Sequence, residues 1–249
     1  MDCSVKMRKV LVSPVAFNEH VKLKNAIQRF LQSRAVGKVE YLIIDDASTD
    51  DTTKIIHEFA DKGVKTIKHE KRMGVGAAIR TAIKYAIAND YEILVIMAGN
   101  DKDNPEEIPD LLDPIFYEGY DLVQGSRYLK GGGIGGDMPF YRKVATKMHP
   151  ALFSLLTHTK LTDSTNGFRA IKLSILADKR IDLEQDWLNA YELEPYLLYK
   201  AVTLGYKVKE AAVTKIYPPK NLGYTKMKPI VGWWSILRPL FYLGLGIRK

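Results

Sequence analysis

The chain has 249 residues, 46% of them hydrophobic and 27% charged, so it is long and apolar enough to bury the core of one large folded domain. Its single cysteine, Cys3, excludes a disulfide framework and a thiolate metal cluster. The excess of 37 Lys and Arg over 29 Asp and Glu gives a net charge of +8, which suits a nucleic acid, an anionic membrane surface or a phosphorylated substrate as partner. Because the basic residues are scattered, we expect no nucleic-acid partner. The first residues lack the apolar run of a signal peptide, and no window has the roughly 18 apolar residues of a membrane-spanning helix, so we expect a cytoplasmic protein.

The first half of the chain alternates short apolar runs with amphipathic ones, the pattern of a parallel sheet covered by helices. Strands are predicted at Lys9–Ser13, Glu40–Ile44, Val64–Lys68, Ile93–Met97 and Leu122–Gln124. Helices are predicted at Glu19–Ser33, Thr52–Asp61, Gly76–Ala88 and Pro105–Tyr117. The short connections favour an α/β fold with one doubly wound, mainly parallel sheet and helices on both faces. Such sheets bind ligands beyond the carboxyl ends of their strands, so the residues that follow each strand are the candidates for a site.

The second half begins with the glycine-rich stretch 125–139, which predicts a mobile loop. Further on, the pattern predicts a helix at Tyr141–Thr157, a second helix at Asn189–Thr203 and a strand at Val208–Lys215. The tail 229–249 is apolar and aromatic, and its tryptophans and arginines suit a membrane–water interface. The alternative is that the tail packs on the protein's own core or on a partner subunit.

Paired carboxylates and a glycine turn follow the second and third predicted strands. Asp45 and Asp46 can accept hydrogen bonds from a base N–H and from ribose hydroxyls, although capping of the next helix is an alternative role. The turn from Lys71 to Gly76 precedes a helix whose N-terminal N–H groups could bind phosphate.

An acidic turn follows the fourth predicted strand and contains Asn100, Asp101 and Asp103. Mg²⁺ and Mn²⁺ bind through one or two carboxylates together with substrate phosphates, so these three residues are candidate metal ligands. The alternative is a solvated turn that caps the following helix. Zinc is not expected, because no histidine lies nearby.

Six segments in order resemble family 2 glycosyltransferases of the GT-A type: PVAFNE, IDDASTDDT, the acidic turn before NPEEIPDLL, GSRYLKGG, NGFRA and GYTKM. The resemblance is strongest to polyprenol-phosphate synthases, such as dolichol-phosphate mannose or glucose synthases, and covers about residues 8–228. It implies a GT-A domain over residues 1–228, with a nucleotide-binding half at 1–124 and an acceptor-binding half at 125–228. The segment 229–249 would follow as a tail.

The resemblance also implies residue roles. Base, ribose and diphosphate of the donor would contact Pro14, Ala16, Glu19, Asp45, Asp46, Arg72, Gly74 and Lys220. The acceptor would contact Arg127, Arg142 and Arg169, with catalytic roles for Arg127 and for Glu194 or its neighbour Glu192. The family usually has Asp-x-Asp after the fourth strand, whereas this chain has Ala98-Gly99-Asn100, so Asp101 and Asp103 would have to hold the Mg²⁺ or Mn²⁺.

The implied activity is transfer of a sugar, with inversion, from a GDP- or UDP-linked donor to a polyprenyl phosphate. Alternatives are transfer to a sugar hydroxyl, for which Glu194 would be the base, and a non-catalytic relative that only binds nucleotide sugars. A nucleotidyltransferase is disfavoured because PVAFNEH lacks a glycine-rich, arginine-containing loop. A dinucleotide-dependent oxidoreductase is disfavoured because GxGxxG is absent after the first strand. The glycosyltransferase hypothesis requires carboxylates and basic groups from distant segments to converge on one cleft.

Overall fold

The computed structural model describes residues 9–219, 227 and 229–248. Lys220, one of the predicted donor contacts, lies outside this part of the chain. The main sheet has seven strands in the order β3-β2-β1-β4-β7-β5-β8. Its strands are β1 (Val10–Ala16), β2 (Glu40–Asp45), β3 (Val64–Lys68), β4 (Ile93–Ala98), β5 (Leu122–Ser126), β7 (Arg169–Lys172) and β8 (Val208–Ala212). All neighbours pair in parallel except β7, which runs antiparallel between β4 and β5.

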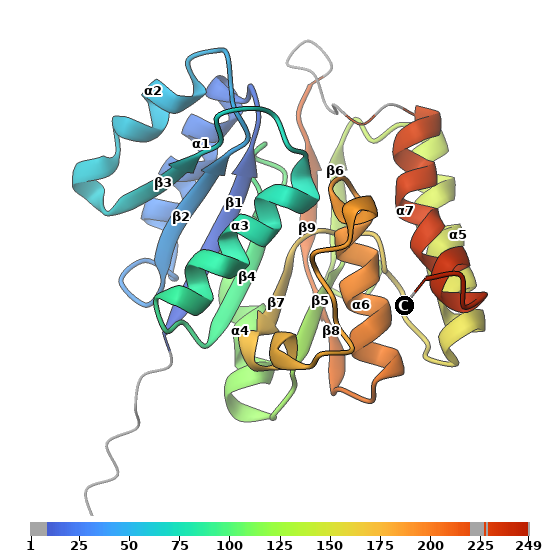
Figure 1. The fold of residues 1–249 in the computed structure, drawn as a ribbon. Helices are drawn as coiled ribbons and strands as arrows, with labels where there is room; N and C mark the ends of the chain where they lie inside the picture. The colour runs from blue at the N-terminus through green and yellow to red at the C-terminus, as the bar shows by residue number, and fades with distance from the viewer. Residues whose placement is uncertain (1–8, 220–226, 228, 249) are drawn as a thin grey trace, which may run out of the picture.

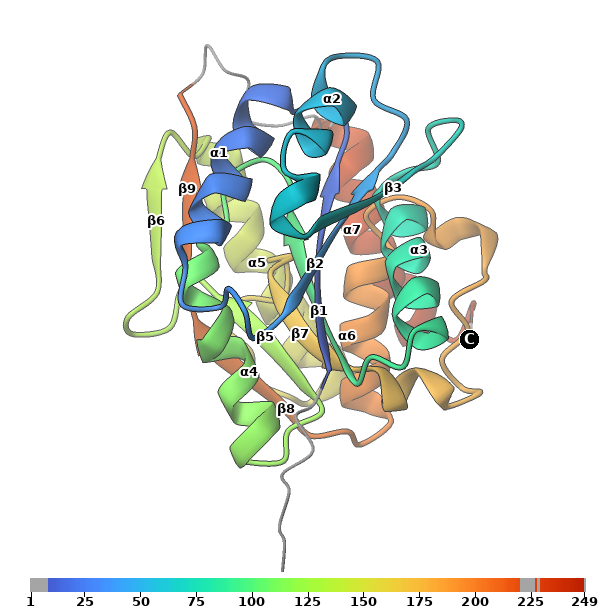
Figure 2. The same ribbon diagram turned by 90° about the vertical axis from the view of Figure 1, so that its left-hand side faces the viewer.

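Helices cover both faces of this sheet, as Figures 1 and 2 show. One face packs against α1 (His20–Gln32), α2 (Thr52–His57) and α4 (Ile108–Tyr117). The other packs against α3 (Val75–Ala88), α5 (Phe140–Thr157), α6 (Leu193–Thr203) and α7 (Pro229–Gly244). Short 3₁₀ turns occur at Ala60–Lys62, Pro105–Glu107, Leu173–Ala177 and Asp186–Leu188. The predicted α/β fold with helices on both faces is confirmed.

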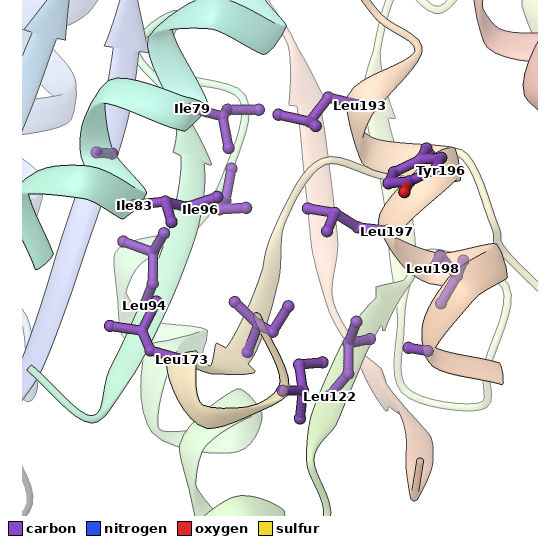
Figure 3. Close-up of a cluster of buried hydrophobic side chains, with 14 of the residues drawn as sticks. Ile79, Ile83, Leu94, Ile96, Leu122, Leu173, Leu193, Tyr196, Leu197 and Leu198 are labelled. Atoms are coloured by element: carbon purple, nitrogen blue, oxygen red, sulfur yellow. The ribbon is translucent and has the colours of Figure 1, made fainter. Parts of the chain in front are cut away.

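The core is divided by the sheet into two clusters, because successive side chains of a strand point to opposite faces. In β4, Leu94 and Ile96 join one cluster, whereas Val95 joins the other. Figure 3 shows the first cluster, in which Ile79 of α3 and Leu193 of α6 extend toward each other beside β4. Burial of each such side chain contributes about 1.5–3 kcal/mol, so this cluster fixes α3 against α6.

The five predicted strands are present as β1 to β5, but the second half differs from the prediction. The glycine-rich stretch is not all loop, because β6 (Gly133–Gly136) pairs in parallel with β9 (Thr214–Tyr217) in a small second sheet. A Cβ atom on Gly136 would lie 2.0 Å from the Tyr217 carbonyl oxygen, so a glycine there permits the close approach.

The predicted strand Val208–Lys215 is two strands, separated at Val213. The Val213 N–H donates to the Ser126 carbonyl in β5, and its carbonyl accepts from Gly133 in β6. One residue therefore passes the chain from the main sheet to the small one. Two helices also differ from the prediction: Asp61 falls in a 3₁₀ turn after α2, and α6 begins at Leu193 rather than Asn189.

The C-terminal segment forms α7, which packs against α5 and α6. Leu240 is fully buried, and Arg238 Nη2 lies 2.6 Å from Glu192 Oε1 ahead of α6. The inner face of α7 thus belongs to the core, while Ile230, Trp234 and Phe241 remain exposed. Among the helices described, none combines the length and the apolar character needed to cross a bilayer.

Candidate active site

A cleft of about 290 Å³ lies beyond the carboxyl ends of β1 and β4. Its walls come from segments far apart in the sequence, including Phe17 after β1, Arg72 before α3, Asn100 after β4, Arg142 on α5 and Glu194 on α6. This is the edge where ligands of doubly wound sheets bind, because the strands end there and their connections are open to solvent.

Four of the residues proposed to contact the donor line the cleft, namely Glu19, Asp46, Arg72 and Gly74. Asp46 is buried and holds the turn that follows β3. Its Oδ1 accepts from the Met73 N–H and from His69 Nδ1, each at 2.8 Å, and its Oδ2 accepts from the Gly74 N–H at 2.8 Å. At the mouth, the Arg72 guanidinium stacks on the Phe17 ring with 4.1 Å between Cζ and the ring centroid.

Asp45 lies behind this wall. It is fully buried, its Oδ1 accepts from the Ser48 N–H at 2.9 Å and its Oδ2 accepts from Thr53 Oγ1 at 2.5 Å. These contacts shape the turn into α2, which agrees with the local structural role considered as the alternative to nucleotide binding. Pro14 and Ala16, within β1, are likewise absent from the lining.

Four N–H groups at the glycine turn and the start of α3, where the sequence suggested phosphate binding, are hydrogen-bonded within the protein. The carbonyl of Asn189 accepts from Gly76 N at 3.0 Å and from Ala77 N at 3.2 Å, while Met73 and Gly74 donate to Asp46. The glycines instead allow the backbone of 188–190 to approach α3. A Cβ on Gly76 would lie 2.1 Å from the Leu188 carbonyl oxygen.

The two carboxylates of the acidic turn after β4 are not part of the cleft lining. Asp101 pairs with Arg29 of α1, with 2.8 Å between Oδ1 and Nη1. Asp103 pairs with Lys215 of β9 through Oδ1 at 2.6 Å, and its Oδ2 accepts from the Ala98 N–H at 2.9 Å. The alternate residues Asn100 and Lys102 line the cleft instead.

Lys102 is only 4% exposed. The pKa of its ammonium group is lowered to about 7, mainly by burial and also by the positive charges of Arg142 and Lys215. Such crowding of positive charge favours an anionic ligand, because a bound anion offsets both the repulsion and the loss of hydration.

The donor set at this turn does not fit Mg²⁺ or Mn²⁺. The buried Oδ1 of Asn100 has no hydrogen-bond partner among the described residues, but it is a single neutral amide oxygen in a cleft that Lys102 also lines. Hard divalent ions need carboxylates, and Asp101 and Asp103 are already paired. Within residues 9–219, 227 and 229–248, no three His, Cys, Asp or Glu side chains are grouped to hold a metal ion.

The three predicted acceptor arginines all line the cleft but differ in their contacts. Arg127 forms a buried bidentate pair with Asp163, at 2.6 Å from Nε and 2.8 Å from Nη2. Arg169 donates to the carbonyl oxygens of Glu194 and Asn166. In contrast, Arg142 has no acidic partner in the described part of the chain, and its Nε is buried without a hydrogen-bond partner there.

The two candidate catalytic carboxylates lie in different environments. Glu194 lines the cleft, and burial raises the pKa of its carboxyl group, although Arg169 and Lys215 oppose that shift. Glu192 is buried outside the lining, where it pairs with Arg238 and accepts from the Ala190 N–H at 3.0 Å. Of the two, Glu194 is therefore the one positioned to meet a substrate.

The model of the family described as "Glycosyl transferase family 2" matches residues 14–178. The chain belongs to glycosyl transferase family 2. It is a glycosyltransferase with the GT-A fold, as the resemblance implied.

Named relatives of this glycosyltransferase span most of its length. A polyprenol monophosphomannose synthase of Mycolicibacterium smegmatis is 29% identical, over 88% of this chain and 81% of the relative. An undecaprenyl-phosphate mannosyltransferase of Micrococcus luteus is 28% identical, over 89% of this chain and 88% of the relative. Among solved structures, glucosyl-3-phosphoglycerate synthase of Mycobacterium tuberculosis, in complex with Mn²⁺, UDP and phosphoglyceric acid, has a TM-score of 0.67 and 19% identity, over 94% of this chain and 78% of that structure.

The glycosyltransferase cleft also contains residues that the motifs did not indicate, namely Lys102, Lys215 and Trp233. The indole N–H of Trp233, on α7, is buried without a partner among the described residues. Lys102 stands between two aspartates in the sequence, which favoured a solvated acidic turn. Strand alternation could not indicate Lys102 either, because Asp101 has a φ of 58° and the turn is not extended.

Proposed function

We propose that this glycosyltransferase moves a sugar from a GDP- or UDP-linked donor to the phosphate group of a polyprenyl phosphate. The observation that carries the proposal is a pair of buried donors on the α5 and α7 wall, Arg142 Nε and Trp233 Nε1, which have no hydrogen-bond partner among the described residues. Buried donors favour an acceptor oxygen strongly, and a guanidinium suits phosphate in particular. The names of the relatives, which include polyprenol and undecaprenyl phosphate mannosyltransferases, support the same acceptor class.

In this proposal the nucleotide lies on the side of residues 1–124. Arg72 and Phe17 stand at the mouth, where a stacked guanidinium can contact a base or a phosphate, and Glu19 lines the wall beneath them. Asp46 shapes this wall through the turn at 69–74. The acceptor lies on the side of residues 125–248, against Arg142 and Trp233.

The transfer then forms one bond and breaks one bond at the anomeric carbon. An acceptor phosphate oxygen attacks this carbon from the face opposite the donor diphosphate, and the electron pair of the broken C–O bond leaves with the nucleoside diphosphate. The phosphate is already anionic, so the step needs no strong base. Cationic groups lining the cleft stabilise the charge on the leaving diphosphate.

We further propose that the enzyme meets this acceptor at an anionic membrane surface through an apolar strip on α5 and α7, two helices that lie side by side in Figure 1. The strip consists of the exposed side chains Phe140, Val144, Met148, Leu155, Ile230, Val231, Trp234 and Phe241. Lys143, Lys147 and Arg248 are exposed beside it. Apolar and aromatic groups flanked by cations are typical of helices that lie in the membrane interface.

The test is an assay of the full chain in detergent micelles, with GDP- and UDP-linked hexoses as donors. Polyprenyl phosphate is compared with the matching polyprenol and with a soluble oligosaccharide. We expect a glycosyl phosphoprenol from the phosphate alone. Transfer to the alcohol or the oligosaccharide, with none to the phosphate, would overturn the proposal.

A second candidate, transfer to a sugar hydroxyl, is favoured by one observation. Glu194 is a carboxylate in the cleft whose pKa is raised by burial, as a general base requires.

A further inference from the structure

We propose that Lys102 supplies the positive charge that holds the donor diphosphate, so that this glycosyltransferase binds its donor without a divalent metal ion. The inference rests on the proposed function, because it assigns the diphosphate to this cleft. It departs from the family pattern of Asp-x-Asp after the fourth strand.

The backbone of the turn fixes which side chains enter the cleft. Gly99 donates to the Val15 carbonyl at 2.9 Å, and a Cβ at Gly99 would lie 2.8 Å from that same oxygen, so the turn is held tightly against the end of β1. Asp101 has a φ of 58°, which reverses the chain locally. The Lys102 carbonyl accepts from Ile216 of β9 at 2.9 Å. Lys102 is thereby anchored on both sides and presents its side chain to the lining.

Each acid of this turn is neutralised by a basic residue from another element. Arg29 of α1 forms an ion pair with Asp101, and Lys215 of β9 forms one with Asp103. Neither carboxylate can therefore coordinate a metal ion without breaking its ion pair. In the family pattern the turn contributes negative charge that a metal reverses, whereas here it contributes an ammonium group directly.

Three cations converge where the turn meets β9 and α5. Lys102, Lys215 and Arg142 all line the cleft, and the ring of Tyr217 lies 5.1 Å from Lys102 Nζ and 5.9 Å from Arg142 Cζ. A lysine ammonium carries three donors and one point charge, which suits the oxygens of a diphosphate. Charge-assisted contacts of this kind are among the stronger hydrogen bonds of proteins.

The first experiment is calorimetry of UDP and GDP with the full chain, once in EDTA and once with Mn²⁺, after elemental analysis shows the protein to be metal-free. We expect whichever nucleotide binds to have Kd values within threefold of each other in the two buffers. Binding that requires Mn²⁺ would overturn the inference.

The second experiment compares Lys102→Met with Lys38→Met in EDTA. Lys38 is exposed shortly before the first residue of β2, whereas the cleft lies beyond the carboxyl ends of the strands. Its substitution therefore makes the same change in charge away from the cleft. We expect Lys102→Met to weaken nucleoside diphosphate binding at least tenfold. Its weak affinity for the nucleoside should stay within threefold of the wild-type value. Lys38→Met should change neither affinity. Wild-type affinity for the diphosphate in Lys102→Met would overturn the inference.

If Lys102→Met does not fold, Lys102→Arg replaces it, and we expect that variant to bind the diphosphate in EDTA. A loss of more than tenfold in acceptor affinity with unchanged donor affinity would assign Lys102 to the acceptor and overturn the inference. Failure of the proposed function is distinguishable, since it would appear as binding without transfer to polyprenyl phosphate, or as no binding of UDP or GDP in either buffer.

Discussion

Glu192 and Glu194 are two residues apart, yet they serve different purposes because α6 begins between them. Glu192 precedes the helix and joins it to α7 through Arg238. Glu194 lies in the first turn, and its carboxyl group faces the cleft, where a Cβ on Gly167 would be 2.5 Å from Oε1. The two side chains therefore provide a matched pair of substitutions.

We expect Glu194→Gln to keep its kcat within about threefold of wild type when the acceptor is a phosphate, because an anionic acceptor needs no base. A loss of about 10²–10⁴-fold would instead support a hydroxyl acceptor. The burial that raises the pKa of Glu194 disfavours its charge, so the neutral variant should remain folded. Glu192→Gln is the control. It should lower the free energy of unfolding by about 1.5–3 kcal/mol, because the contact to Arg238 is weakened.

Arg142 and Arg127 form a second pair that separates substrate binding from stability. Arg142→Gln should raise the KM for polyprenyl phosphate about tenfold or more with little change in the melting temperature, because no acid among the described residues depends on it. Arg127→Gln should lower stability by about 3–5 kcal/mol, because it leaves Asp163 buried without its ion pair. Steady-state kinetics and thermal denaturation measure the two effects, and an unchanged KM in Arg142→Gln would contradict the acceptor assignment.

The sequence predicted the residue types of the site better than their contacts. Glu19, Asp46, Arg72 and Glu194, which the motifs singled out, line the cleft. Asp101 and Asp103 do not, because each is paired with a cation from another element. Such pairings depend on tertiary contacts between segments more than 70 positions apart, which no local pattern contains.

Among the elements, α3 is held to the segment 188–190 by its glycines. Gly76→Ala improves the intrinsic helix propensity by about 1 kcal/mol, yet it places a Cβ 2.1 Å from the Leu188 carbonyl oxygen. We expect a net loss of about 2 kcal/mol or more in the free energy of unfolding, measured by denaturant titration. Gly133→Ala in β6 is the control, because no atom lies within 4 Å of its added Cβ. Equal stability of the two variants would contradict this account.

His149 links α5 to α7. Its Nε2 donates to the Ile236 carbonyl at 3.2 Å, so in the neutral ring Nδ1 accepts from Ser164 Oγ at 2.6 Å. Burial lowers the pKa of His149 from 6.5 to about 4, so the folded protein binds fewer protons than the unfolded chain between these values. Its contribution to stability is complete above pH 6.5 and is lost as the pH falls toward 4.

We expect the melting temperature to fall between pH 7 and pH 4.5, with His149 accounting for up to about 3 kcal/mol of the loss. His149→Gln retains an amide donor but does not titrate, so its melting temperature should decline less over the same range. A parallel decline in both proteins would exclude His149 as the cause.

The elements also show which structure the sequence could predict. The strands β1, β2 and β4 are long, apolar and buried on both faces, and their pattern was sufficient. The strand β6 consists of three glycines and an isoleucine, and β7 begins with a buried arginine, so neither carries a strand pattern. Both exist because neighbouring strands supply their hydrogen bonds, which is a tertiary cause.

For the whole molecule, the packing of α7 changes how membrane binding must be tested. Removing residues 229–249 would expose the surroundings of Leu240 and leave Glu192 without Arg238, so a truncated chain would report instability as well. Substitutions on the outer surface avoid this. Phe140 and Ile230, which are 80% and 86% exposed at the starts of α5 and α7, are suitable positions.

We expect the wild type to float with anionic vesicles, less so at high salt, and the double variant Phe140→Glu and Ile230→Glu to remain unbound. Tyr117→Glu is the control, since Tyr117 is 82% exposed on α4, which covers the other face of the sheet. Equal flotation of the double variant and the control would contradict a membrane contact through α5 and α7.

The two faces of α7 have a consequence for the lipid acceptor. Trp233 and Ile236 line the cleft, whereas Trp234 and Phe241 are exposed to solvent. One helix thus separates the reaction centre from the surface that we assign to the bilayer. A prenyl tail can stay dissolved in hydrocarbon while only its head group enters the enzyme, so the number of isoprene units beyond the first few should have little influence on kcat/KM.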